Sequence, residues 1–341
     1  AAAEVGNDAA AQAGATGLLT SAQSADSAPH PDDVAGERPG VGPGGSAGDA
    51  GSGQPVRARA AALTLRGAAR LGAGDLTAES DLADGMAEAT GVGLTRTVRI
   101  CQGRLALVHA FRGELTTAER LARQALGAAP FGGRTRPADG LHAHLAQALV
   151  ALHRDRRDDA ERYLTLVIEA AGPEPEPVVA ALGGLVRAEL LRDRGELAGA
   201  RQAVAAGRRH LGDWPAGGAV RHCLLAVEAD LRAAHGDIDG ARDLLLAALA
   251  DGRAPAEPLA VALSRTQLRA GEHRTAAGSL PDWTSPAADD WLLPVRLAAG
   301  LLDATVARRG GDHRRAALCL ERVLRLAEPE GFRRIFTRAD P

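Results

Sequence analysis

The stretch Gly236-Asp-Ile-Asp-Gly-Ala-Arg-Asp-Leu-Leu-Leu-Ala-Ala-Leu249 decides the fold, because its pattern recurs along the chain. A Gly precedes an acidic residue, an Ala follows five positions after the Gly, and apolar residues return at positions 8, 9, 12 and 13 after it. These positions share one face of a helix that has about 3.6 residues per turn. The stretch therefore predicts a glycine turn followed by an amphipathic helix.

The same signature returns at nearly constant intervals. Clear copies start at Gly113, Gly195, Gly271 and Gly311, and weaker copies start at Gly74 and Asp155. The intervals between these anchors and Gly236, taken in chain order, are 39, 42, 40, 41, 35 and 40 residues. A fixed period of this length is the mark of a repeat array. Two copies are imperfect, since the apolar register of the copy at Gly195 fades after Val204 and Pro281 cuts the copy at Gly271 short.

Each unit is predicted to be a helical hairpin. The Gly takes positive φ and ends a first helix, the acidic residue lies at the positive end of the second helix, and the small Ala lets the two helices approach. First helices are expected near 57–72 and at 98–112, 141–154, 179–194, 217–235, 255–270 and 294–309. Strand signals are absent. The predicted fold is all-α, a right-handed superhelical solenoid of antiparallel hairpins with about seven repeats of about 40 residues.

The N-terminal part of the chain has a different composition. Residues 1–55 are rich in Ala, Gly, Pro and Asp and poor in large apolar residues, so they are predicted to form a disordered linker. Residues 56–341 are predicted to form the helical repeat domain. The chain also has no initiator Met, and we expect it to be an internal piece of a larger regulatory protein.

Composition argues against several kinds of chemistry. All 40 basic residues are Arg, so a phosphate-binding loop or a Schiff base that needs Lys is excluded. The net charge of −3 gives no reason to expect direct nucleic-acid contact. Three widely spaced Cys and ten scattered His suggest no metal site. We therefore expect no enzyme activity, catalytic residue, cofactor or metal, and a cytoplasmic protein without a membrane segment.

Three tryptophans and one arginine pair are the candidates for a ligand or partner surface. Trp214, Trp283 and Trp291 stand out because aromatic residues make up only 2% of the chain. The tryptophans could instead fill gaps between hairpins. The arginines could simply lie on a solvated face, as arginine clusters usually do. Exposed aromatic and arginine side chains often anchor a partner. Arg333 and Arg334 complete the candidate set.

The repeat signature resembles that of the tetratricopeptide family, in which a Gly precedes the second helix and an Ala lies within it. The C-terminal stretch Ala327-Glu-Pro-Glu-Gly-Phe-Arg-Arg-Ile-Phe336 is similar to the end of the repeat domain in MalT-type, ATP-binding transcriptional regulators of the LuxR family. This second resemblance covers about fifteen residues, from Arg322 to Phe336.

The resemblance implies a sensor domain that lies between an ATPase and a helix-turn-helix domain of the same polypeptide. Its partners would be a small-molecule inducer or a protein bound in the concave groove, together with those two domains, which this chain lacks. Two alternatives stay open. The chain could be a stand-alone scaffold for protein partners, or an enzyme with a site in the groove, although no residue pattern supports the enzyme.

Overall fold

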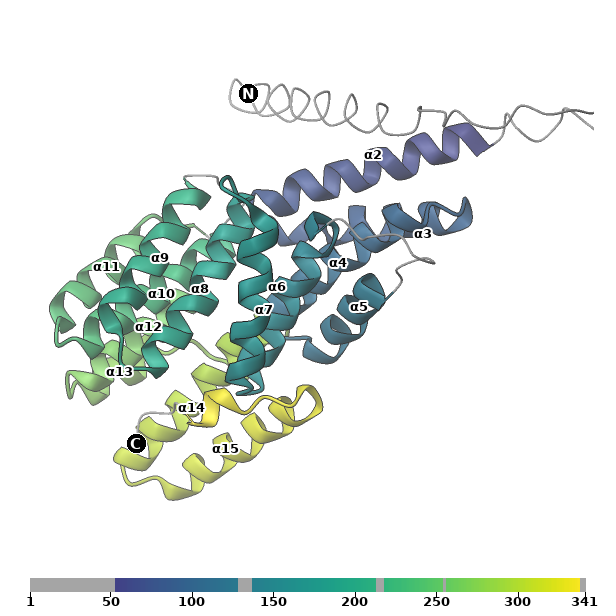
Figure 1. The fold of residues 1–341 in the computed structure, drawn as a ribbon. Helices are drawn as coiled ribbons and strands as arrows, with labels where there is room; N and C mark the ends of the chain where they lie inside the picture. Colours follow the sequence, from purple (N-terminus) through teal and green to yellow (C-terminus); the bar gives the residue numbers. More distant parts are fainter. Residues whose placement is uncertain (1–52, 128–136, 213–217, 254–255, 338–341) are drawn as a thin grey trace, which may run out of the picture.

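The computed structural model describes residues 53–127, 137–212, 218–253 and 256–337, and every regular element within these ranges is a helix (Figure 1). The helices form antiparallel pairs, which confirms the predicted all-α solenoid of hairpins. The pairs are α2 (Gly53–Gly72) with α3 (Glu79–Gly91), α4 (Thr95–Arg112) with α5 (Leu115–Gly127), α6 (Pro137–His153) with α7 (Arg157–Ala171), α8 (Pro177–Asp193) with α9 (Leu197–Leu211), α10 (Gly218–Ala234) with α11 (Ile238–Ala250), α12 (Glu257–Arg269) with α13 (His273–Ser279), and α14 (Leu293–Arg309) with α15 (His313–Ala327). Short 3-10 turns lie at Leu76–Ala78 (η1), Pro286–Asp290 (η3) and Glu328–Glu330 (η4), and α16 spans Arg334–Thr337.

The predicted N-terminal linker, residues 1–55, falls almost wholly outside the described residues. The first described helix, α2, begins at Gly53, close to the predicted start of the repeat domain at residue 56.

The turn within each hairpin has the backbone that the repeat signature predicts. The glycine anchors have positive φ, with values of 94° at Gly113, 91° at Gly236 and 83° at Gly311. In the weak third copy the anchor is Asp155, and it is the one non-glycine residue with positive φ in the described ranges, at 57°. The register inferred from sequence is therefore correct even where the Gly is missing.

The acidic residue and the Ala of the signature also take their predicted places. The carboxylates of Asp237 and Asp312 cap α11 and α15, where they accept hydrogen bonds from the backbone N–H of Gly240 at 3.0 Å and of Arg315 at 2.9 Å. The signature Ala is fully buried in five consecutive hairpins, where it permits close contact between the two helices. These residues are Ala118, Ala160, Ala200, Ala241 and Ala276.

The two imperfect repeats have different structural causes. Helix α9 is a full-length helix in which Gly207 faces α8 closely; a Cβ at Gly207 would lie 3.1 Å from Ala181 Cα. The apolar register fades there because backbone contact replaces side-chain contact. Helix α13 is short and ends at Ser279, just before Pro281, as the sequence predicts.

The last hairpin returns to the early hairpins, so the array closes on itself. Gly113, in the turn after α4, lies against the start of α14, and a Cβ there would be 2.8 Å from both Leu293 Cβ and Pro294 Cδ. In Figure 1, α14 and α15 accordingly lie next to the α6–α7 end of the molecule. We call residues 328–337, which follow α15 and include η4 and α16, the closing segment.

Candidate functional site

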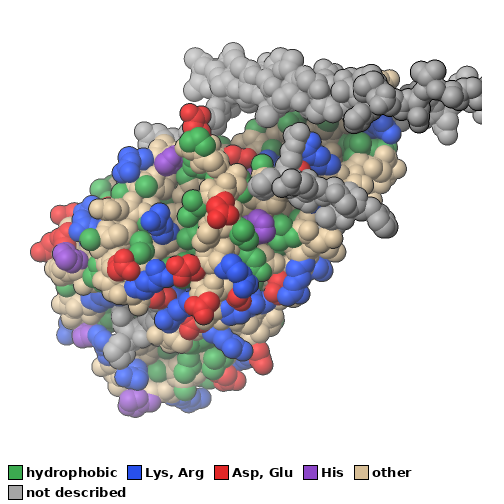
Figure 2. Space-filling view, viewed as in Figure 1, with side chains coloured by type: hydrophobic (Ala, Val, Ile, Leu, Met, Phe, Trp, Pro, Cys, Tyr) green, Lys and Arg blue, Asp and Glu red, His purple; other side chains and the backbone are tan. Residues whose placement is uncertain are grey.

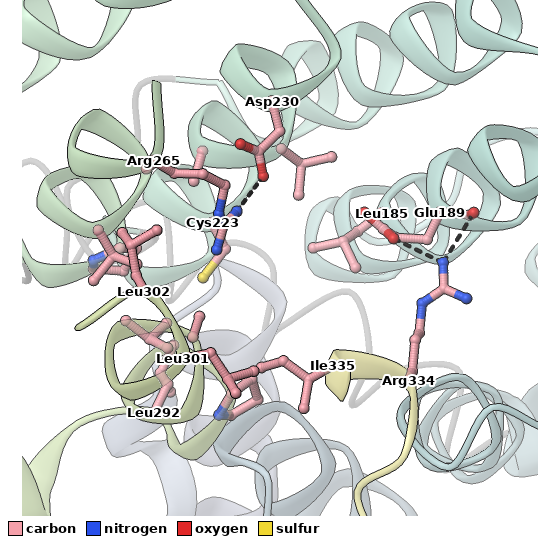
Figure 3. Close-up of a pocket in the computed structure, with 18 of the residues that line it drawn as sticks. Leu185, Glu189, Cys223, Asp230, Arg265, Leu292, Leu301, Leu302, Arg334 and Ile335 are labelled. Carbon is pink, nitrogen blue, oxygen red and sulfur yellow. Dashed lines mark hydrogen bonds and ion pairs between the residues drawn. The ribbon is translucent and has the colours of Figure 1, made fainter. Parts of the chain in front are cut away.

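A pocket of about 280 Å³ lies on the inner side of the solenoid, where the first helices of successive hairpins face one another. Helices α6, α8, α10, α12 and α14 line it, and the end of α4 and the closing segment complete its wall. Figure 3 shows Leu292, Leu301 and Leu302 near the Arg265–Asp230 pair on one side of the pocket, and Arg334, next to Ile335, reaching Glu189 on the other side. The pocket lining therefore combines apolar side chains with two arginine–carboxylate pairs.

One register position supplies a pocket residue from five consecutive hairpins. This position lies six residues before the turn anchor, and its occupants are Leu149, Glu189, Asp230, Arg265 and Thr305. Three of the five are charged, although the first helices are otherwise mostly buried and apolar. A charged residue at an inward-facing repeat position was the signal in the sequence that could have located the site.

The first ion pair of the pocket joins neighbouring hairpins. Arg265 on α12 donates through Nη1 to Asp230 Oδ2 on α10. Arg269, one turn further along α12, donates to the backbone carbonyl of Asp230 at 3.5 Å, and its Nη1 lies 3.7 Å from Asp230 Oδ1. Two guanidinium groups thus share the carboxylate of Asp230 at this end of the pocket.

The second ion pair connects the closing segment to the middle of the array. Arg334, only 5% exposed, donates to Glu189 Oε2 at 2.8 Å and to Asp193 Oδ2 at 2.5 Å, both on α8. Glu189 is also 3.5 Å from Arg192. Because the Arg334 side chain is desolvated and paired with two carboxylates, it holds the closing segment against α8.

Other contacts fix the closing segment on α5 and α6. Glu330 accepts a hydrogen bond from the backbone N–H of Thr116 at 2.7 Å, and its carbonyl accepts one from Arg154 at 3.1 Å. The backbone N–H of Arg333 donates to the carbonyl of His153 at 3.0 Å. The Phe332 ring packs on the His153 ring with 5.0 Å between centroids.

Two titratable groups of the pocket are neutral at pH 7. Burial, reinforced by the charge of Arg334 and opposed by that of Glu189, lowers the pKa of His153 to about 4. Burial raises the pKa of the Cys223 thiol to about 12. The charge of the pocket lining is therefore set by its arginines and carboxylates.

Of the four predicted site residues that the structure describes, one lies in the pocket wall. Arg334 lines it, whereas the neighbouring Arg333 is exposed. Trp291 is partly buried beside the pocket residue Leu292. Trp214 lies outside the described residues.

Trp283 is placed in the interior of the last hairpin. It is 2% exposed, donates through Nε1 to Asp303 at 3.1 Å, and its ring packs against the backbone at Gly300. Trp283 therefore fills a gap beside α14. This placement matches the alternative interpretation, in which the tryptophans fill gaps and do not form a partner surface.

The outer face of the described hairpins carries charges of both signs. Figure 2 shows Arg and Asp or Glu side chains intermixed over the region of α6 to α9. Pairs such as Arg162 with Asp159, at 2.9 Å, account for this pattern. Exposed pairs of this kind contribute little stability each, about 0–1 kcal/mol.

Two kinds of feature are absent from the described ranges. No group of at least three His, Cys, Asp or Glu side chains lies close enough together there to hold a metal ion. None of the described helices has the length and apolar character needed to cross a membrane.

Comparisons with known proteins add little to these observations. No protein-family model matches the sequence, and no curated protein matches it. A solved structure from work titled "Functional Characterization of Pseudomonas Aeruginosa pilF" is 17% identical, and the match covers 71% of this chain and 96% of that chain with a TM-score of 0.37. A score this low supports no inference about function.

Proposed function

We propose that the chain is the regulatory helical-repeat domain of a MalT-like regulator of the LuxR family and that its pocket receives a small-molecule inducer. The observation that carries the proposal is that the same segment resembles the end of this family's repeat domain and lines the pocket. Residues 327–336 resemble the end of that family's repeat domain, and residues 334 and 335 form part of the pocket wall. In this proposal the domain has neither ATPase nor DNA-binding activity of its own.

The contacts of the closing segment supply a mechanism. A ligand in the pocket touches Arg334 and Ile335, which belong to the segment, and also the first helices of several hairpins. A ligand that binds differently to the seated and released segment shifts the equilibrium between them by its difference in affinity. The segment would transmit that shift to a domain that follows it in the polypeptide.

The coding sequence on either side of this chain tests the proposal. We expect a helix-turn-helix domain with a segment like Leu-Thr-x-Arg-Glu within about eighty codons after Pro341, and an ATPase domain before residue 1. A full-length gene without either domain would contradict the assignment to a LuxR-family regulator.

The second candidate function is a scaffold for protein partners, and one surface favours it. Helix α15 leaves Leu320 and Leu324 exposed, four residues apart on one face, and Leu318 exposed on another side. Exposed apolar clusters often mark protein contacts. If the scaffold is the main function, replacing Leu320 and Leu324 with Glu should abolish the binding of a cellular partner, while the pocket substitution Ala298→Phe should leave it unchanged.

A further inference from the structure

We propose that two copies of this chain associate through the outer face of α15, where the two α15 helices pack as an antiparallel pair about a twofold axis. This contact is separate from the pocket and from the regulator assignment, and it gives the exposed leucines of α15 one specific occupant. An open core position of the repeat, a seam with heptad spacing and self-complementary charges carry the proposal.

A core position of the repeat is open on α15. The position nine residues after the turn anchor is at most 7% exposed in the four hairpins from α4–α5 to α10–α11, where its occupants are Ala122, Leu164, Val204 and Leu245. In the last hairpin the occupant is Leu320, which is 41% exposed. The same position is therefore core in the middle of the array and surface on α15.

In the middle of the array, the first helix of the next hairpin covers this position. Leu245 lies in one apolar cluster with Leu259 and Leu263 of α12. A Cβ at Gly183 of α8 would lie 3.8 Å from Leu164 Cδ1 on α7. Within the described part of the chain, the residues after α15 turn to α5, α6 and α8 instead, and α15 forms the lower edge of the molecule in Figure 1. The open position on α15 therefore fits another helix.

The exposed face of α15 has the spacing of a seam between two helices. Four exposed residues are separated by four, three and four positions, the a and d spacing of a heptad: His313, Ala317, Leu320 and Leu324. Leu324 is 48% exposed, and an antiparallel pair that sets it against Leu320 of the second copy would remove all four leucines from water. Leu318 lies outside this series, although it is 57% exposed.

The charges beside the seam are complementary to themselves. Arg314 and Glu328 are exposed and flank the seam near its two ends. An antiparallel pair places Arg314 of each copy beside Glu328 of the other, whereas a parallel pair would place like charges together. Glu321 lies near the twofold axis, and its own Arg325, 3.5 Å away, offsets its charge. The charges therefore favour the twofold, antiparallel arrangement, in which one surface binds itself.

The size of the contact predicts a weak dimer. Helix α15 has 15 residues and is about 22 Å long. A single pair of such helices buries less than the roughly 1,200–2,000 Å² of stable, specific interfaces. We therefore expect a dissociation constant of about 10–100 µM.

Sedimentation equilibrium of the whole 341-residue chain, at concentrations from about 1 µM to about 1 mM, tests the proposal. The mass should rise from that of one chain toward that of two, and no further, because a twofold contact is closed. A chain that stays monomeric over this range, or that forms larger assemblies without a dimer, would overturn the proposal.

Three exposed leucines of α15 provide a matched set of variants. Leu320→Glu and Leu324→Glu should each raise the dissociation constant at least about tenfold, because each would bury a carboxylate in the seam. Leu318→Glu, on another side of the same helix, should leave it unchanged. Circular dichroism melts check that each variant is folded. Equal effects of the substitutions at Leu318 and Leu320 would contradict the seam.

Charge reversal tests the antiparallel orientation. Arg314→Glu and Glu328→Arg each place like charges together twice in a dimer, so each variant alone should dimerise about three- to tenfold more weakly. An equal mixture of the two variants should recover the affinity of the wild type, because both contacts of the mixed pair join opposite charges. Both substitutions suit the helix dipole, so loss of α15 would not explain a weaker dimer. A mixture that dimerises no better than its components would overturn the antiparallel pairing.

The dimer and the regulator assignment fail separately. Sedimentation reports on the face of α15, and the flanking coding sequence reports on the regulator. A chain that dimerises through α15 without regulator domains would keep the dimer and reject the regulator, and regulator domains around a monomeric chain would do the reverse. A monomeric chain that loses a cellular partner on Leu320→Glu would assign the face to that partner and reject the second copy.

Discussion

At the scale of single residues, the repeat register distinguishes a buried leucine from an exposed one on α11. Leu245 and Leu246 are adjacent on α11, yet Leu245 is 0% exposed and Leu246 is 47% exposed. Leu245 occupies position 9 after its anchor, which is one of the predicted core positions, and Leu246 does not. This neighbouring pair provides a matched test of the register.

Leu245→Asp should destabilise the protein by several kcal/mol, about 3–5, because it places a carboxylate without a partner in the interface of helices α10, α11 and α12. Leu246→Asp, on the exposed side of the same helix, should change the free energy of unfolding by no more than about 0.5 kcal/mol. Urea unfolding followed by circular dichroism measures both. Equal effects of the two substitutions would contradict the register.

The low pKa of His153 predicts a loss of stability in acid. The unfolded chain takes up a proton near pH 6.5, whereas folded His153 takes it up only near pH 4. The unfolded state therefore binds more protons between these values, so stability falls as pH decreases through this window, by up to about 1.4 kcal/mol per pH unit. Unfolding of the wild type and of His153→Gln, compared at pH 7 and pH 5, should show a smaller loss for the variant. An equal loss in the wild type and in His153→Gln would contradict this prediction.

At the scale of elements, the closing segment is the part that the repeat rule does not describe. It follows the last hairpin, takes a left-handed turn at Gly331 with φ of 72°, and places Arg334 between the turn that joins α6 to α7 and helix α8. Its neighbours in space come from hairpins far away in the sequence. Arg334 and the adjacent exposed Arg333 therefore differ in role although they are the same residue type.

Arg334→Met should cost about 3–5 kcal/mol, because Glu189 and Asp193 would remain largely buried after the loss of their closest cation. Arg333→Met should cost no more than about 0.5 kcal/mol. Hydrogen exchange of residues 328–337 should become faster in the first variant only. Unchanged protection of this segment in Arg334→Met would mean that the ion pairs do not hold it.

At the scale of the whole molecule, the contact between the turn at Gly113 and the start of α14 closes the solenoid. Gly113 and Gly236 have nearly the same φ, 94° and 91°, and occupy the same repeat position. A Cβ at Gly236 would meet nothing within 4 Å, whereas one at Gly113 would meet Leu293, Pro294 and Phe332. The two glycines therefore differ only in the long-range contact.

Gly113→Ala should be more destabilising than Gly236→Ala by about 1–3 kcal/mol, since both carry the strain of positive φ and only the first also overpacks the closure. Thermal unfolding of the two variants measures the difference. Equal losses would indicate that the second and last hairpins do not meet in solution.

Much of the fold followed from local pattern. Asp155 has the positive φ that the repeat signature assigns to a Gly, and α13 ends before Pro281. Both features follow from the sequence because turn geometry and helix termination depend on residues close in sequence. Of the residues that the sequence singled out and the structure describes, Arg334 lies in the pocket wall. Trp283 stood out by its rarity, but rarity does not distinguish a core aromatic from a surface one.

The sequence by itself determined the helical hairpins, their number and their register, because 3.6-residue periodicity, glycine turns and helix caps act within about forty residues. Only the tertiary structure decided where the array closes and what its inner face contains. The pocket joins Asp230, Arg265 and Arg334 from separate hairpins, and the position of each depends on how every intervening hairpin stacks on the next. Small rotations between hairpins add up along the array, so no local pattern encodes that sum.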